Sequence, residues 1–134
     1  MSNSYEHPLF GKVIHAYTRQ QMIDDGTLID VSKVAREAGF RFPVAITHAA
    51  WSSYVVPSIN DAARWGQDTE GRLWDTLYML LVEIKRGNNG QVVMYSVYYR
   101  LNGRLELKRL KAIAGPGDHG EPVITIMLPD ENND

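Results

Sequence analysis

Apolar and polar residues alternate most regularly between positions 91 and 113, and this pattern predicts a β-hairpin. Asn102-Gly103 lies at the middle of the stretch, and both residue types accept the positive φ angles of a tight turn. Four apolar residues of the first strand share one parity: Val93, Tyr95, Val97 and Tyr99. Leu105 and Leu107 have the same parity in the second strand, so we expect the hairpin to have one apolar face.

The length of the turn decides which residues of the hairpin lie opposite each other. A two-residue turn at Asn102-Gly103 would pair Tyr99 with Glu106 and mix apolar with charged residues on one face. A three-residue loop over 101–103, with a left-handed Gly103, pairs Tyr99 with Leu105 instead. We therefore expect the three-residue loop.

Helix-capping residues predict two short helices in the N-terminal half. Thr18 and Gln21 have the spacing of a capping box, and Gly26 supplies the stop of the first helix. The second helix is expected over 32–38, with Gly39 as its stop. The remaining expected elements are helices over 47–55 and 58–65 and short strands over 11–16 and 28–31.

Two stretches of the chain fit both helix and strand. Residues 44–46 form either a strand or the first turn of a helix entered through Pro43. Apolar residues recur at helical spacing over 72–86, yet the second half of this stretch alternates and a glycine-rich turn follows it. We favour a short helix over 72–79 followed by a strand over 80–86, with one continuous helix as the alternative.

The apolar, β-branched run over 123–128 predicts a central strand. Together the elements predict an α+β fold, with a three- to four-stranded, mostly antiparallel sheet and the N-terminal helices packed on one face. At 134 residues, the chain is expected to form a single domain over 1–134. Its ends, residues 1–9 and 130–134, are expected to be loosely ordered.

Composition excludes several classes of protein. The chain has no cysteine, so it forms neither a disulfide scaffold nor a thiolate metal site. No apolar run reaches the roughly 18 residues of a membrane span, and the N-terminus lacks the pattern of a secretory signal, so we expect a cytoplasmic protein with no membrane contact. The common phosphate-binding, zinc-protease and serine-hydrolase motifs are also missing from the sequence, and we expect no cofactor and no metal.

Positive charge is concentrated in the hairpin. Seven Lys and Arg residues stand against one Glu between positions 85 and 111, although the whole chain carries a net charge of −2. In the expected register, the outer face carries Tyr98, Arg100, Arg104 and Lys108, residue types that contact phosphates and stack on bases. Such residues also keep an exposed strand soluble and block edge pairing, and this plain interpretation is the first alternative.

The loop GPGDHGEP gathers residue types that often serve in functional sites. Asp118, His119 and Glu121 are close enough in sequence to suggest ligands for a divalent ion. A turn in which Asp118 caps its own backbone explains the same residues without a metal, and we favour it. We keep Asp118 and His119 as candidate binding residues because loops on a rigid sheet commonly carry function.

The segment VIHAYT, which leads into a helix, resembles the opening of ADP-ribosyltransferase-like folds. This resemblance implies an enzyme that uses a nicotinamide dinucleotide, with His15 as its first site residue. Tyr95, Tyr98 or Tyr99 would supply the second residue and Glu121 the third. A histidine beside an apolar run also occurs as a hydrogen-bonded structural residue, so a structural role for His15 is the alternative.

Residues 13–51, GRLWDTLYML and especially GPGDHGEPVITIMLP resemble a family of small uncharacterised proteins carried on bacterial plasmids, integrative elements and phages. The resemblance implies an accessory protein of a mobile genetic element, and such proteins often inhibit host defence or regulate transfer. We therefore expect a non-catalytic protein that binds a host protein or nucleic acid, as a monomer or as a homodimer that pairs through a strand edge.

Overall fold

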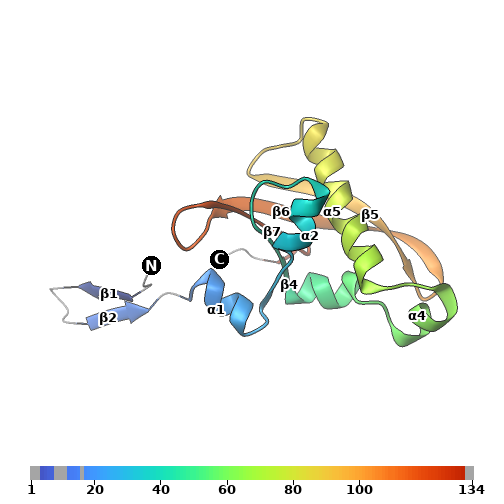
Figure 1. The fold of residues 1–134 in the computed structure, drawn as a ribbon, viewed down its shortest axis with the longest axis horizontal. Coiled ribbons are helices and arrows are strands. Elements are labelled where there is room, and N and C mark those ends of the chain that lie inside the picture. The colour runs from blue at the N-terminus through green and yellow to red at the C-terminus, as the bar shows by residue number, and fades with distance from the viewer. Residues whose placement is uncertain (1–3, 8–11, 16, 132–134) are drawn as a thin grey trace.

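The computed structural model describes residues 17–131 in full and the backbone of residues 4–7 and 12–15. Its main sheet has five strands in the order β3-β4-β7-β6-β5 (Figure 1). The strands of this sheet are β3 (Leu28–Asp30), β4 (Val44–Thr47), β5 (Val92–Leu101), β6 (Arg104–Pro116) and β7 (Pro122–Met127). β1 (Ser4–His7) and β2 (Lys12–His15) pair with each other in a separate antiparallel sheet.

The sheet is mostly antiparallel, as expected, but it has five strands instead of three or four, and the pairing of β4 with β7 is parallel. The predicted strand over 123–128 is confirmed as β7 and occupies the centre, where it pairs antiparallel with β6 and parallel with β4. Residues 44–46, which fitted either strand or helix, belong to β4. About eighty residues separate β4 from β7, and local patterning does not show that two such distant runs become neighbours.

Several helices of the structure begin at a residue whose side chain caps them. Thr18 and Gln21 form the predicted capping box at the start of α1 (Arg19–Asp24), and Ser58 caps α4 (Ile59–Trp65). The remaining helical elements are α2 (Ser32–Ala38), α3 (His48–Ala50), a π-helical turn (Trp51–Val55) and α5 (Thr69–Lys85). Capping residues are local in sequence, so these starting points could be predicted.

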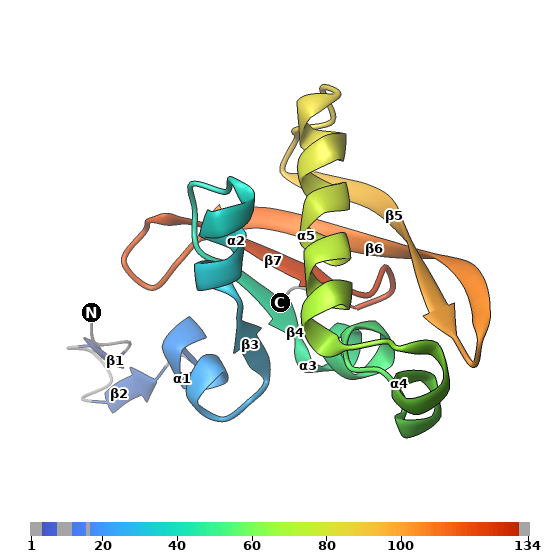
Figure 2. The ribbon, with the colours of Figure 1, turned by 45° about the vertical axis from the view of Figure 1, so that its right-hand side comes forward.

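The favoured prediction over 72–86 was wrong, because α5 is one continuous helix of 17 residues that crosses the sheet beside β5 (Figure 2). The side chain of Asp68 caps its first turn by accepting a hydrogen bond from the amide of Gly71 (2.6 Å). Leu73, Leu77 and Leu80 are buried against the sheet. Apolar residues of neighbouring stripes also pack on this core, so the second half of the helix alternates in sequence although it is not a strand.

One helix departs from the expectation that all helices lie on one face of the sheet. Ile124 and Ile126 of β7 point into the core with α5, and Thr125 between them points to the opposite face. Arg19 of α1 donates to the hydroxyl of Thr125 (2.6 Å) and to the carbonyl oxygen of Ile124 (2.9 Å). α1 therefore covers part of the second face of the sheet.

The hairpin of β5 and β6 is confirmed, but its expected register was wrong. Asn102 and Gly103 have φ angles of +53° and +76°, and they form a two-residue turn that pairs Tyr99 with Glu106. Lys108, which lies opposite Val97, forms an ion pair with Glu106 at 3.3 Å. These two charged residues point to the same side of the hairpin as the buried residues Val97 and Tyr99, and they neutralise each other there. The apolar pattern of β6 therefore does not set the register.

Gly103 lets this turn lie against Trp65. A Cβ atom at Gly103 would lie 2.7 Å from Nε1 of the Trp65 ring, which stacks over the guanidinium of Arg100 at 5.2 Å. We expect Gly103→Ala to cost the roughly 1–2 kcal/mol of a left-handed alanine and, in addition, the displaced ring. Gly26→Ala is the matched control, because Gly26 has φ +86° and open space around it. Urea unfolding measures the free energy of unfolding of both variants. An equal loss in the two variants would show that contact with Trp65 adds nothing to the cost at Gly103.

Candidate functional site

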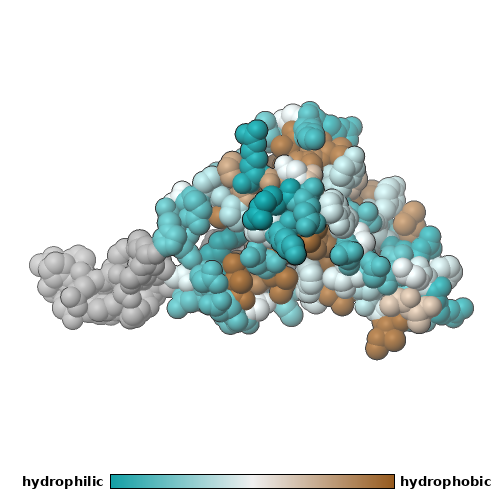
Figure 3. All heavy atoms as spheres, viewed as in Figure 1, coloured by the Kyte–Doolittle hydropathy of each residue, from teal (hydrophilic) through white to brown (hydrophobic). Residues whose placement is uncertain are grey.

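The outer face of the β5–β6 hairpin combines exposed apolar side chains with cationic side chains. Tyr98 lies opposite Leu107, Arg100 opposite Leu105, and Ser96 opposite Arg109. We call these six residues the hairpin outer face. Tyr98, Leu105 and Leu107 are 58%, 61% and 54% exposed. Figure 3 views another side of the molecule. On that side, hydrophobic surface forms only separate patches among hydrophilic residues.

The structure brings together only half of the four hairpin residues that the sequence placed on this face. Tyr98 and Arg100 lie on it, whereas Arg104 and Lys108 have the opposite parity, so the expected cationic ribbon of four residues was wrong. Arg109 lies on the face and was missed as a site residue. The two-residue turn at Asn102-Gly103 is the sequence signal that could have placed Arg109 on this face. A shift of the hairpin register by one residue moves each side chain of β6 to the other face.

Two buried charged residues fix the position of the hairpin turn. Asp61 of α4 and Arg72 of α5 are 2% and 3% exposed and form an ion pair at 3.5 Å. The carboxylate of Asp61 accepts hydrogen bonds from the amides of Asn102 and Gly103, each at 2.9 Å. Arg72 donates to the carbonyl oxygens of Tyr54 (3.1 Å) and Arg100. The turn is thereby bound to two helices through its backbone.

The ionisation of Asp61 depends on these contacts. Burial of the carboxyl group opposes its ionisation, but hydrogen bonds from Asn102, Gly103 and Ser58 and the positive charge of Arg72 outweigh it, so the pKa of Asp61 lies below its ordinary value. The folded protein therefore favours the carboxylate more strongly than the unfolded chain does.

Two tyrosines of β5, Tyr95 and Tyr99, point into the core. The hydroxyl of Tyr99 lies 2.6 Å from that of Thr76, and the hydroxyl of Tyr95 donates to the carbonyl oxygen of Thr76 (3.1 Å). Tyr99 also stacks on Tyr54, with ring centroids 5.3 Å apart. Burial raises the pKa of both Tyr95 and Tyr99. Of the three tyrosines named by the ADP-ribosyltransferase resemblance, Tyr98 alone is exposed.

The GPGDHGEP loop works as an anchor for α1. The carboxylate of Asp118 accepts from the amides of Arg19 (2.8 Å) and Gln20 (3.0 Å), so Asp118 caps α1, which corrects the expected cap on its own backbone. Glu121 accepts from the amide of His119 at 2.9 Å. Within the described residues, no group of three or more His, Asp or Glu side chains could hold a metal ion.

The enzyme prediction for His15 stays a prediction. Its side chain lies outside the described residues.

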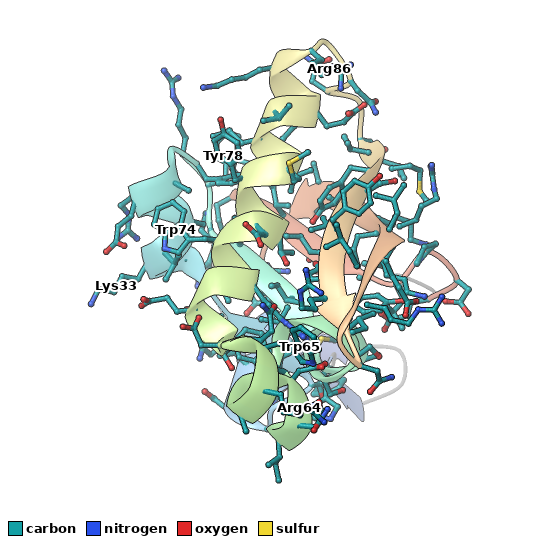
Figure 4. The ribbon with its side chains drawn as sticks, turned by 90° about the vertical axis from the view of Figure 1, so that its right-hand side faces the viewer. Lys33, Arg64, Trp65, Trp74, Tyr78 and Arg86 are labelled. Atoms are coloured by element: carbon teal, nitrogen blue, oxygen red, sulfur yellow. The ribbon has the colours of Figure 1, made fainter. Side chains whose placement is uncertain are left out.

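A cleft of about 500 Å³ lies next to the hairpin outer face, between α5 and the edge strand β5. Figure 4 views this side of the molecule, with Arg86 at the end of α5 and Trp65 close to the hairpin turn. Residues of α5 that line the cleft include Asp75, Met79, Glu83 and Arg86. Asp75 makes no hydrogen bond or ion pair with the described residues, and partial burial raises the pKa of its carboxyl group.

These features define an α+β protein with a mixed five-stranded sheet and an open, partly apolar hairpin face. The chain belongs to a family of unknown function (DUF6573), whose model matches residues 1–132. No curated protein and no solved structure matches the chain. Within the described residues, no helix is long and apolar enough to cross a membrane.

The lowered pKa of Asp61 predicts how stability depends on pH. A group with a depressed folded pKa stabilises the protein above its unfolded pKa of about 3.9, and this contribution is lost as pH falls through the folded pKa. Asp61→Asn cannot ionise, so its free energy of unfolding is expected to fall less than that of wild type as the solution is acidified below this pH. Urea unfolding at a series of pH values measures both curves, and parallel curves would exclude the linkage.

Removal of the Asp118 cap is expected to loosen α1. Asp118→Ala leaves the amides of Arg19 and Gln20 without their acceptor, at a cost of about 0.5–2 kcal/mol. We expect faster hydrogen exchange at these two amides and unchanged exchange in β5. Glu121→Gln is the control, because it keeps an acceptor for the His119 amide, and Glu121 makes no hydrogen bond with the described residues of α1. Equal exchange in Asp118→Ala and wild type would show that the cap does not hold the helix.

Proposed function

We propose that this chain is a non-catalytic binding protein whose hairpin outer face contacts a protein partner. The observation that carries the proposal is the exposure of three large apolar residues of one sheet face, Tyr98, Leu105 and Leu107, with Arg100 and Arg109 beside them. Exposed apolar surface with arginine and tyrosine among it is typical of protein interfaces. The partner would cover the apolar side chains and place acidic groups near the two arginines.

The register supports a protein partner more than a nucleic acid. A phosphate backbone requires several cations along one surface. Arg104 and Lys108 have the opposite parity to Tyr98, and Lys108 is already paired with Glu106. The two leucines would add nothing to phosphate binding, but they contribute apolar area to a protein interface.

Three acidic groups of the structure accept hydrogen bonds that hold the fold together. Asp118 and Glu121 accept hydrogen bonds from backbone amides, and so does Asp61. The mobile-element setting and the inhibition of a host defence system are part of the proposal that comes from the sequence resemblance alone.

Capture experiments with a bacterial lysate test the proposal. Leu107→Asp puts a charge at the centre of the hairpin outer face, and we expect it to reduce capture of the partner at least about tenfold. Ile59→Asp is the matched control, because Ile59 of α4 is an even more exposed apolar residue outside this face. Capture should survive nuclease treatment of the lysate.

Three results would contradict the proposed function. One is that the wild-type chain captures no partner, and another is that Leu107→Asp captures it as well as Ile59→Asp does. Loss of capture after nuclease treatment would assign the face to nucleic acid.

A further inference from the structure

The open edge of β5 is a long row of backbone groups that no strand of the described chain pairs. Ala114 donates its amide hydrogen to the carbonyl oxygen of Gln91 (2.8 Å), which shows that odd-numbered residues of this strand point their backbone groups at β6. Even-numbered residues therefore point theirs outward. Arg72 and Asn88 confirm this parity, because their side chains reach the carbonyl oxygens of Arg100 and Met94 from the open side.

Apart from the side-chain hydrogen bonds to the carbonyl oxygens of Arg100 and Met94, this edge lacks the features that usually keep an edge strand from pairing. β5 has ten residues, it contains no proline, and its one charged residue is Arg100, near its end. Proteins commonly shorten or charge such edges, because an unprotected edge is a template for another strand. The exposed side chains along this edge include Val92 and Tyr98.

The helix beside the edge has charges of opposite sign at the two ends of one stripe. Asp75, Met79, Glu83 and Arg86 recur at intervals of three or four residues, so they share the side of α5 that lines the cleft. Asp75 has no cationic partner among the described residues. Arg86 is largely exposed and contacts Glu83 only at 4.0 Å.

We propose that a second copy of this chain occupies the cleft, with the two β5 strands paired antiparallel about a two-fold axis near Tyr95. The even-numbered backbone groups then bond across the axis, with the partner strand replacing the side chain of Asn88 at the carbonyl oxygen of Met94. Val92 lies opposite Tyr98 of the partner subunit. The two α5 helices run antiparallel beside each other, which places Asp75 next to the partner subunit's Arg86, twice. Met79 lies in the middle of this helix contact.

A second copy of the chain is the favoured occupant because α5 carries both the acidic and the basic residue of the proposed helix contact. A two-fold interface requires a surface that is complementary to itself, and an antiparallel stripe with an acid at one end and a base at the other meets this requirement. The pairing also places a β-branched and an aromatic residue opposite each other, a stabilising cross-strand pair. The inference does not rest on the proposed function, although the cleft shares Ser96, Tyr98, Leu107 and Arg109 with the hairpin outer face.

Sedimentation of the full chain over a range of concentrations tests the dimer. We expect a species of twice the 15.2 kDa chain mass. Asp75→Arg and Arg86→Asp should each weaken the dimer at least about tenfold, because each creates two like-charge contacts. The two single variants mixed together should associate again as a heterodimer, since each then supplies the charge that the other lacks.

Two further variants separate the interface from the fold. Ser96→Pro removes an outward amide hydrogen that β6 does not use, so it should yield a folded monomer. Lys33→Glu is the charge control, because Lys33 lies on α2, on the other side of α5 from β5 (Figure 4), and it should leave the dimer unchanged. Circular dichroism checks that each variant is folded.

Several results would overturn the inference. A wild-type chain that sediments as a 15.2 kDa monomer at every concentration excludes the dimer. A dimer that persists in folded Ser96→Pro uses another surface. Single charge variants that remain dimeric, or a mixture that fails to associate, exclude the pairing of Asp75 with Arg86 of the partner subunit.

Discussion

The buried ion pair of Asp61 and Arg72 is the interaction on which the rest of the structure depends. A guanidinium and a carboxylate inside a core are tolerated only when hydrogen bonds satisfy both. Here three of these hydrogen bonds join the two charges to the backbone of the hairpin turn, at Arg100, Asn102 and Gly103. Satisfying the two charges therefore requires the turn to lie in one place, between α4 and α5. The need to satisfy these two charges thereby fixes the position of the β5–β6 hairpin.

The position of this turn also decides which side chains the hairpin outer face carries. Because side chains alternate along a strand, a shift of one residue exchanges the two faces. With the two-residue turn, Leu105 and Leu107 face outward beside Tyr98, and Glu106 and Lys108 pair with each other on the inner parity. The same sequence in the three-residue register would have buried the leucines and presented a basic ribbon. The composition of the hairpin outer face thus follows from contacts made at the turn.

Local features of this chain could be predicted from sequence, and features set by distant contacts could not. Thr18 and Gln21 cap α1 with residues three positions apart, and Asn102-Gly103 carries its turn preference in two residues. The hairpin register depends on Asp61, about forty residues earlier in the chain, and the role of Asp118 depends on α1 at the other end of the sequence. The pattern of α5 was misleading because a helix packed on several sides loses its simple period.

The hairpin presents two surfaces with different requirements. Its outer face offers side chains, so a partner there is selected by shape, apolar contact and charge. Its edge offers backbone groups, which accept any extended strand, and selectivity there must come from neighbouring side chains. The stripe of α5 beside the edge supplies such side chains, with Asp75 and Arg86 about three helical turns apart. In the dimer that we propose, an acidic and a basic group at that separation would distinguish an antiparallel copy of the same helix from an unrelated strand.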